Sequence, residues 1–221
     1  MMGNEKEIFE ALCNAIANYD EEGAKKIAKE AVEAKLDLIQ GIKLMSEVLR
    51  GIGERFHCGE LFLPHLVMAS DAMLAAVHVF EEHIPKDDLA KTRSGTIVMG
   101  TVEGDLHDVG LNIVAMTLLT SGFEVINLGK DTSVDKFVEK AQQVNADIIG
   151  ASALLSVTLS KQRDLVDEVK SRKLPFRVMV GGGPVTRQWA EQIGADGYGA
   201  DAQEAVESAK QLMEEKKGGG K

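Results

Sequence analysis

Hydrophobic positions in the first third of the chain recur at helical spacing. One stretch places six of them on one face: Leu38, Ile42, Met45, Leu49, Ile52 and Phe56. No run in this region alternates between apolar and polar residues as a half-buried strand does. The pattern predicts helices over residues 5–18, 21–34, 36–57 and 63–83. We expect them to form a four-helix bundle, with Asn4 and Asp20 capping the first two helices.

The periodicity changes beyond a polar linker that starts at Pro85 and ends near Ser94. Short runs rich in β-branched residues then alternate with helical stretches, which predicts a parallel sheet covered by helices on both faces. The predicted strands are Thr96–Gly100, Glu124–Leu128, Asp147–Ser152, Arg177–Val180 and Gly197–Tyr198. The predicted helices are residues 109–121, 133–144, 158–171, 185–193 and 201–214. Such a succession favours the flavodoxin-like (Rossmann-like) strand order 2-1-3-4-5.

These two patterns predict the fold class α + α/β, with an N-terminal four-helix bundle followed by a flavodoxin-like five-stranded parallel sheet. We place the bundle at residues 1–90 and the α/β domain at residues 91–215. The lysine- and glycine-rich tail, residues 216–221, is expected to be disordered.

Composition limits the classes of partner. The 221 residues are 44% hydrophobic, which is enough for a proper core, and the net charge of −10 argues against nucleic acid or an anionic membrane surface as a partner. No secretory signal is visible, and apolar stretches such as Met73–Phe80 are too short to span a bilayer. The isolated Cys13 and Cys58 fit a reducing compartment. We therefore expect a cytoplasmic protein that binds neither nucleic acid nor a membrane.

Three short motifs fall in the α/β half. The first is Asp105-x-His107-x-x-Gly110, the second is Ser152-x-Leu154, and the third is Gly181-Gly182. In the strand order 2-1-3-4-5 they follow the first, third and fourth strands. Because ligands bind outside the carboxyl ends of the strands, near the switch point of such a sheet, the three motifs converge on one predicted site.

Together the motifs resemble the signature of proteins that bind cobalamin with its own base displaced and a protein histidine on the cobalt (base-off, His-on). The resemblance implies that His107 is the axial ligand of cobalt, a role that neutral imidazole suits. Asp105, two residues earlier on an extended loop, can reach the other ring nitrogen and orient the ring. In the family a hydroxyl hydrogen-bonds this aspartate. The matching residue here is Thr158, where serine is common, and Ser156 is a second candidate.

The glycines of the motifs have a steric role in this interpretation. Gly104 and Gly110 let the loop turn and let the following helix approach the corrin. Ser152, Gly181 and Gly182 are expected to hold the displaced dimethylbenzimidazole tail. The other residues expected near the cofactor are Asp108, Val109, Leu154, Gly183, Gly199 and Asp201. Taken alone, the glycine run is an ordinary turn between a strand and a helix. A dinucleotide site is disfavoured because no G-x-G-x-x-G follows the first strand.

The other histidines favour a plain structural interpretation. They are scattered over the predicted helices, at His57, His65, His78 and His83. His78 and Glu81 have the i, i+3 spacing found in di-metal bundles, but no second such pair accompanies them.

The resemblance extends over the whole chain. The segments Phe56–Pro64, Gly100–Asp108 and Gly194–Gly199 are similar to corrinoid methyl-carrier proteins, which are related to the cobalamin-binding module of methionine synthase. These proteins serve three-component methyltransferase systems of methanogens and acetogens. Leu111 departs from the pattern, since many relatives have lysine there.

The family implies a set of partners and a cycle. A substrate-specific methyltransferase moves a methyl group onto cob(I)alamin. A second methyltransferase moves it from methylcob(III)alamin to a thiol or to tetrahydrofolate, and a reductive activator rescues Co(II). Methylamines or quaternary amines such as glycine betaine are the favoured donors, and methanol and aryl methyl ethers also occur. The bundle is the expected lid over the corrin, with Leu61, Phe62, Leu63 and Met73 as its apolar cap. No catalysis is expected from this chain alone.

Three alternatives stay open at this point. The cobalamin subunit of a carbon-skeleton mutase shares the motifs but usually lacks the bundle. A cobalamin-dependent sensor or regulator would need a basic DNA-binding segment. A flavodoxin-like module that binds no cobalamin would make the spaced motifs a coincidence.

Overall fold

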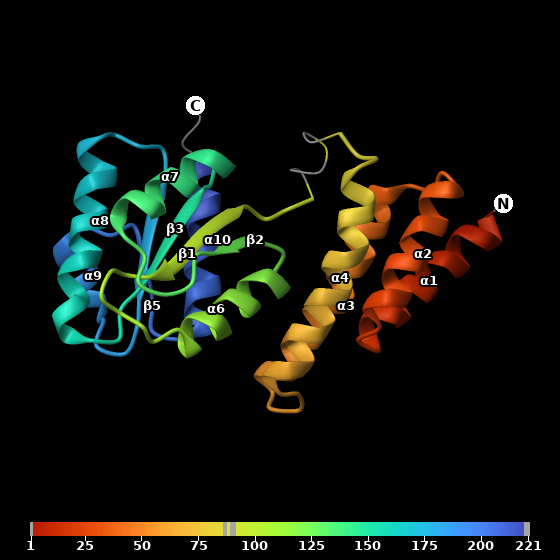
Figure 1. Ribbon diagram of the computed structural model, residues 1–221, viewed down its shortest axis with the longest axis horizontal. Helices are drawn as coiled ribbons and strands as arrows, with labels where there is room; N and C mark the ends of the chain where they lie inside the picture. The colour runs from red at the N-terminus through yellow and green to blue at the C-terminus, as the bar shows by residue number, and fades with distance from the viewer. Residues whose placement is uncertain (1, 86–87, 89–91, 219–221) are drawn as a thin grey trace. The chain divides into compact units, whose positions relative to one another are not determined.

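The computed structural model describes residues 2–85, 88 and 92–218 of the 221 in the chain (Figure 1). The chain divides into two compact units near residue 93, except that residues 120–122 group with the first unit. Each unit has its own hydrophobic core, and each is described here by itself.

The first unit is helical. Its helices are α1 Met2–Ala17, α2 Glu21–Glu33, α3 Leu38–His57 and α4 Leu63–Glu81. Leu12, Met45 and Phe80 are buried in its core. The Asp20 carboxylate accepts a hydrogen bond from Gly23 N at 2.9 Å, so the predicted cap of α2 is confirmed. The cap predicted at Asn4 is wrong, because α1 already begins at Met2.

Helix α4 is apolar over most of its circumference. Its buried residues include Leu66, Ala72 and Phe80, while Met68 and Leu74 are exposed. It is the one helix in the described part of the chain whose length and composition would allow it to cross a membrane. The sequence-based expectation rested on the shorter stretch Met73–Phe80 and therefore missed the length of this apolar helix. The buried residues of α4 pack in the core of the helical unit, which accounts for the apolar residues on that face.

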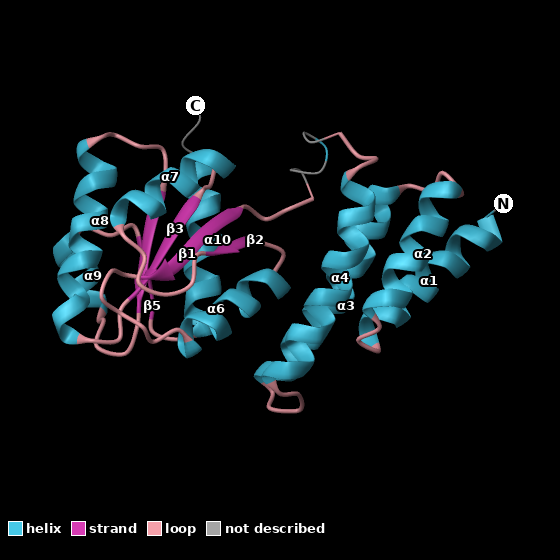
Figure 2. Ribbon diagram, viewed as in Figure 1, coloured by secondary structure: helices cyan, strands magenta, loops and turns pink. Residues whose placement is uncertain are grey.

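The second unit contains a parallel sheet (Figure 2). Its strands are β1 Thr96–Thr101, β2 Glu124–Asn127, β3 Ile148–Ser152, β4 Arg177–Gly181 and β5 Gly197–Gly199. They lie in the order β2-β1-β3-β4-β5, and every pairing is parallel. The predicted flavodoxin-like order is therefore confirmed.

Helices cover both faces of this sheet. They are α6 Val109–Thr120, α7 Val134–Val144, α8 Leu159–Ser171, α9 Arg187–Ile193 and α10 Ala202–Gly218, with a short 3-10 turn at Ser156–Thr158. α6 and α10 pack on the face that presents Ile97, whereas α7, α8 and α9 pack on the face that presents Ile149. α10 continues to Gly218, so residues 216–218 are helical rather than disordered. Residues 219–221 lie outside the described part of the chain.

The strand register builds two rows of residues near the carboxyl edge of the sheet. In the outer row, Ser152 lies between Thr101 and Gly181, and Gly181 pairs with Gly199. In the row beneath it, Gly150 lies between Met99 and Met179. Because side chains of a strand alternate between faces, both rows project toward α6 and α10.

Candidate functional site

His107 stands on the loop between β1 and α6, and its imidazole contacts the carboxylate of Asp105. His107 Nδ1 lies 2.9 Å from Asp105 Oδ1, and His107 N donates to the same oxygen at 3.1 Å. The aspartate side chain is 0% exposed, whereas the histidine side chain is 50% exposed. A carboxylate can only accept, so Nδ1 carries the proton, and Nε2 is the ring nitrogen that is left to bind a metal. The contact thus fixes the orientation of the ring.

The second oxygen of Asp105 is bound by the loop that follows β3. Asp105 Oδ2 accepts from Leu154 N at 2.7 Å, from Leu155 N at 3.1 Å and from Thr158 Oγ1 at 2.9 Å. Thr158 is buried, and the other candidate, Ser156, is exposed. The structure therefore places the hydroxyl of Thr158, and not that of Ser156, against Asp105.

These contacts set the charge of the aspartate. Burial raises the pKa of Asp105, but hydrogen bonds from the His107 side chain and from the backbone N–H groups of Leu154, His107 and Leu155 outweigh it. The net result is a pKa well below the usual range of a carboxyl group. Asp105 is therefore ionised at neutral pH and always available as an acceptor for the imidazole.

Asp105→Asn is expected to lower the melting temperature of the cofactor-free protein by roughly 4–8 °C at pH 7. The amide NH2 would face N–H donors whichever way it turned, which costs about 2 kcal/mol. A depressed pKa stabilises the fold above the ordinary value of about 3.8, and this contribution is lost as the pH falls toward the depressed value. Thermal melts monitored by circular dichroism from pH 7 to pH 3 measure the difference between the two proteins.

The pH dependence of the difference in melting temperature distinguishes the loss of the ionised Asp105 from a general destabilisation of the fold. The difference in melting temperature between wild type and Asp105→Asn should stay constant above about pH 5 and become smaller below about pH 4. Asp201→Asn is the matched control. Asp201 caps α10 through a hydrogen bond from Glu204 N at 2.8 Å, and asparagine caps helices as well as aspartate does. A difference that widened in acid would contradict the assigned ionisation of Asp105.

A second set of contacts holds the loop itself. Gly104 has a φ of +81°, and its N–H donates to Asp131 Oδ1 at 2.7 Å. Thr101 Oγ1 donates to the carbonyl oxygen of Asp105 at 2.5 Å and accepts from Asp131 N at 3.0 Å. Thr101 and Asp131 were not found by sequence analysis, because no motif marks a buried strand-end threonine or a loop aspartate.

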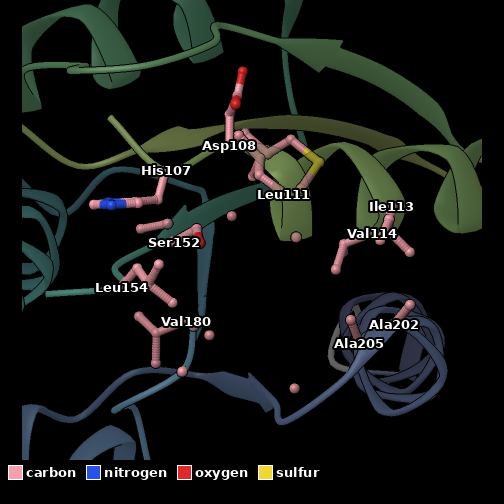
Figure 3. Close-up of a pocket in the computed structure, with 18 of the residues that line it drawn as sticks. His107, Asp108, Leu111, Ile113, Val114, Ser152, Leu154, Val180, Ala202 and Ala205 are labelled. Atoms are coloured by element: carbon pink, nitrogen blue, oxygen red, sulfur yellow. The ribbon is translucent and has the colours of Figure 1, made fainter. Parts of the chain in front are cut away.

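A cavity of about 660 Å³ opens beside His107, between α6 and α10. Ile113 and Val114 of α6 lie on one side of it, and Ala202 and Ala205 of α10 lie on the other (Figure 3). It is lined by most of the sequence-predicted site residues: His107, Asp108, Val109, Gly110, Ser152, Leu154, Gly181, Gly182, Gly183, Gly199 and Asp201.

Four predicted residues do not line the cavity: Gly104, Asp105, Ser156 and Thr158. Asp105 and Thr158 support His107 through the hydrogen bonds described above. Gly104 serves the turn of the loop, and Ser156 has no contact with Asp105 among the described hydrogen bonds.

Two glycines keep the inner wall of the cavity open. Gly182 has a φ of +121°, and a Cβ there would lie 1.9 Å from the carbonyl oxygen of Ala153. A Cβ on Gly181 would lie 2.8 Å from the carbonyl oxygen of Gly199. No side chain fits at either position without moving backbone. Beside them the Ser152 hydroxyl borders the cavity and has no hydrogen-bond partner among the described residues, so it is free to bind a ligand.

Gln162 ties the two strand ends together from the opposite face of the sheet. Its Nε2 donates to Ala151 O at 2.9 Å and to Gly181 O at 3.0 Å, and its Oε1 accepts from Trp189 Nε1 at 3.0 Å. The side chain is fully buried. Sequence analysis missed it, although a signal was present. Gln162 interrupts the apolar face of the predicted helix 158–171 that also carries Leu165.

Replacing Gln162 with leucine should lower the free energy of unfolding by about 2–4 kcal/mol. The indole N–H of Trp189 would lose its partner, which costs about 1–3 kcal/mol before relaxation. Ala151 O and Gly181 O would each lose the bond from the Gln162 amide, although Gly181 O would keep the one from Ala153 N. Urea denaturation measures this. Gln211→Leu is the control, because Gln211 makes only an exposed contact with Glu215. Equal losses in the two variants would contradict the role of Gln162 as a clamp.

The other histidines whose side chains are described belong to no metal site. No group of three or more metal-binding side chains occurs in the part of the chain that the structure describes. His78 Nδ1 contacts Glu81 Oε2 at 3.3 Å, and Glu81 also accepts from Arg93 at 2.8 Å. His65 accepts from Phe62 N at 3.1 Å at the start of α4. The side chain of His57 lies outside the described atoms.

Comparison with known proteins gives two matches to family models, both described as a B12 binding domain. They cover residues 95–207 and residues 8–81. A dimethylamine corrinoid protein of Methanosarcina acetivorans is 42% identical over 217 residues, covering 96% of this chain and 99% of that protein. A trimethylamine corrinoid protein of the same organism is 40% identical, with 95% and 98% covered. A corrinoid protein of Desulfitobacterium hafniense is 41% identical, with 93% and 97% covered.

Solved structures agree with these matches. The methanol:cobalamin methyltransferase complex of Methanosarcina barkeri contains a chain that superposes with a TM-score of 0.80 at 26% identity, covering 94% of this chain and 80% of that one. A cobalamin-binding protein of Desulfitobacterium hafniense gives a TM-score of 0.64 at 32% identity, with 92% and 98% covered. The monomethylamine corrinoid protein of Methanosarcina barkeri gives 0.52 at 32% identity, with 94% and 99% covered.

Proposed function

Because this chain belongs to the corrinoid proteins with a B12 binding domain, we propose that it carries a methyl group on the cobalt of a base-off, His-on cobalamin. It accepts the methyl group from a substrate-specific methyltransferase and presents it to a second methyltransferase acting on a thiol or on tetrahydrofolate. The observation that supports this most strongly is the half-exposed His107, whose Nδ1 is fixed by a buried carboxylate and whose Nε2 makes no hydrogen bond with the described residues.

The residues present fit the cofactor. His107 would be the protein ligand of the cobalt, and Asp105 with Thr158 would keep its imidazole oriented and its Nδ1 protonated. The slot beside His107 is kept open by glycines that tolerate no Cβ, as a nucleotide tail requires, and Ser152 offers a free hydroxyl to that tail. When bound, the cofactor supplies a cobalt centre that takes up and releases a methyl group. The protein contributes the ligand, the orientation of the imidazole and the slot.

For the methyl donor we propose a methylamine. Curated relatives matched over nearly their full length include dimethylamine and trimethylamine corrinoid proteins. We propose three partners: the two methyltransferases and a reductive activator of Co(II).

We further propose that the helical unit shields the upper face of the corrin. Of the four residues expected to form the cap, Phe62 is 68% exposed and Leu63 is partly exposed. Leu61 is buried, and Met73 packs against the bundle core, so these two are unsuited to the role. Met68 and Leu74 of α4 are also exposed apolar side chains.

The test uses the full chain reconstituted with cobalamin and reduced to Co(I) without oxygen. Trimethylamine, dimethylamine, monomethylamine, glycine betaine and methanol are added in turn, with and without a lysate of the organism grown on that compound, and the visible spectrum reports methylation of the cobalt. We expect rapid methylation with a methylamine only when lysate is present. If methanol with lysate gave methylation and none of the amines did, the donor would be methanol and not a methylamine. Saturable methylation without lysate would show that the chain has its own substrate site, and absence of cobalamin binding would overturn the proposal.

Gly110→Ala should separate cofactor binding from folding. A Cβ at this position meets no atom within 4 Å, and Gly110 lies in the first turn of α6 beside the cavity. Alanine is about 1 kcal/mol better than glycine within a helix, so the cofactor-free protein should be as stable as wild type or slightly more stable. Its affinity for cobalamin should fall about 10-fold or more, because the methyl group occupies space that the corrin needs. Gly51→Ala in α3, which also meets no atom, is the control that should leave affinity unchanged.

A further inference from the structure

The cavity beside His107 is polar at its mouth and apolar at its inner end. The outer row of the sheet carries Ser152, whose hydroxyl borders the cavity, and the inner row carries Met99, Gly150 and Met179. Two residues along a strand span roughly 7 Å, so the inner row lies that far from the edge where the histidine stands. A planar group that enters past Ser152 therefore reaches Met99 and Met179 with its distal half.

Among the side chains that line the cavity, those beside the inner row are apolar: Met99, Leu111, Val114 and Met179. The strands around it are paired on both sides in the middle of the sheet, so their N–H and C=O groups are already bonded. Thioether sulfur is only a weak acceptor and cannot donate. A polar group placed there would lose its water and find no side-chain partner on the lining of the cavity.

We propose that this inner end selects the lower base of the cofactor, accepting a benzimidazole with carbon substituents and discriminating against a purine such as adenine. The inference rests on the proposed function, in which the nucleotide tail of the cofactor occupies the slot. Both bases have a five-membered ring, whose free nitrogen can accept from the Ser152 hydroxyl at the mouth. They differ in the six-membered ring, which points to the apolar end.

The difference in chemistry sets the direction and the size of the selection. The six-membered ring of dimethylbenzimidazole carries only carbon and hydrogen. That of adenine carries two ring nitrogens and an amino group, all of which would be buried without partners. One or two unsatisfied polar groups reduce affinity about 10- to 100-fold. The methyl groups of dimethylbenzimidazole add apolar contact with the methionines, which acts in the same direction.

Three cofactors of graded structure test this on the full-length protein. Cobalamin carries dimethylbenzimidazole, the adenine-bearing cobamide carries the purine, and cobinamide lacks the nucleotide tail altogether. Equilibrium titration of the cofactor-free protein should give the tightest binding for cobalamin and about 10- to 100-fold weaker binding for the adenine form. Equal affinities for cobalamin and the adenine form, both above cobinamide, would overturn the selection and leave cofactor binding intact. Cobalamin binding no tighter than cobinamide would instead overturn the assignment of the tail to the slot.

A pair of variants places the selection at the inner end. Met179→Gln adds a donor and an acceptor at nearly constant volume, and Met179→Leu keeps the site apolar. The ratio of the two affinities, cobalamin over the adenine form, is compared within each variant, so that a general loss of stability cancels. We expect the ratio to fall about 10-fold in Met179→Gln and to stay near the wild-type value in Met179→Leu. An unchanged ratio in Met179→Gln would show that the base does not reach Met179.

Discussion

His107→Ala should abolish the axial nitrogen signal of the protein while the fold survives. The side chain is half exposed, and its one described hydrogen bond is to Asp105, so its loss removes little packing. The Co(II) form of the reconstituted wild type should show coupling of the unpaired electron to an imidazole nitrogen in its EPR spectrum. In the variant this coupling should vanish, and affinity for cobalamin should fall about 100-fold or more, leaving the tail as the main anchor.

Two controls sharpen this experiment. His65→Ala removes another histidine with a local hydrogen bond, to Phe62 N, and should leave both the EPR signal and the affinity unchanged. Free imidazole should restore the nitrogen coupling in His107→Ala, because truncation leaves room at the same place. A nitrogen signal that persisted in the variant without added imidazole would contradict the role of His107.

Gly182→Ala should damage both the fold and the cofactor site. The residue has a φ of +121°, which L-residues rarely adopt, and the new methyl group would lie 1.9 Å from the carbonyl oxygen of Ala153. Relief of this contact must move the turn after β4 away from the loop after β3. We expect a loss of about 3 kcal/mol or more in the free energy of unfolding and an affinity for cobalamin at least 100-fold lower.

The neighbouring Gly183 is the matched control for this variant. A Cβ at Gly183 meets only the Cδ1 atom of Leu154, at 2.9 Å, and that end of a flexible side chain can turn away. Gly183→Ala should therefore cost less than about 1 kcal/mol of stability. Urea denaturation and cobalamin titration on both variants measure the contrast. Equal behaviour of the two would mean that the backbone contact of Gly182 does not shape the slot.

Hydrophobic periodicity predicted much of the fold because the elements of each unit have buried apolar faces that are clearly separated from their exposed polar faces. The alternation of strands and helices after Ser94 required a covered parallel sheet, and its strand order is confirmed. Errors were confined to element ends, as at Asn4 and residues 216–218, where local caps rather than periodicity decide. The family is also confirmed by the B12 binding domain matches, and the motifs that pointed to it lie at one edge of the sheet.

The supporting residues of the site were harder to find in the sequence. Gln162, Thr101 and Asp131 act through backbone groups of other segments, so their partners are defined only once the chain has folded. The choice between Thr158 and Ser156 likewise depended on the 3-10 turn, which buries one hydroxyl and exposes the other. The spacing of residues along a helix or strand does not predict such long-range contacts.

Because of the register of β3, this site should not tolerate the insertion or deletion of a residue within the strand. Gly150 and Ser152 face the slot, while Ile149 and Ala151, one position away, are buried on the opposite face. Deleting or inserting a single residue in β3 would exchange these two sets, so that an isoleucine would fill the slot and a serine would enter the core behind it. Natural length variation among relatives should therefore be found in the loops, where an added residue changes reach, and not in this strand, where it would reverse which face can hold a ligand.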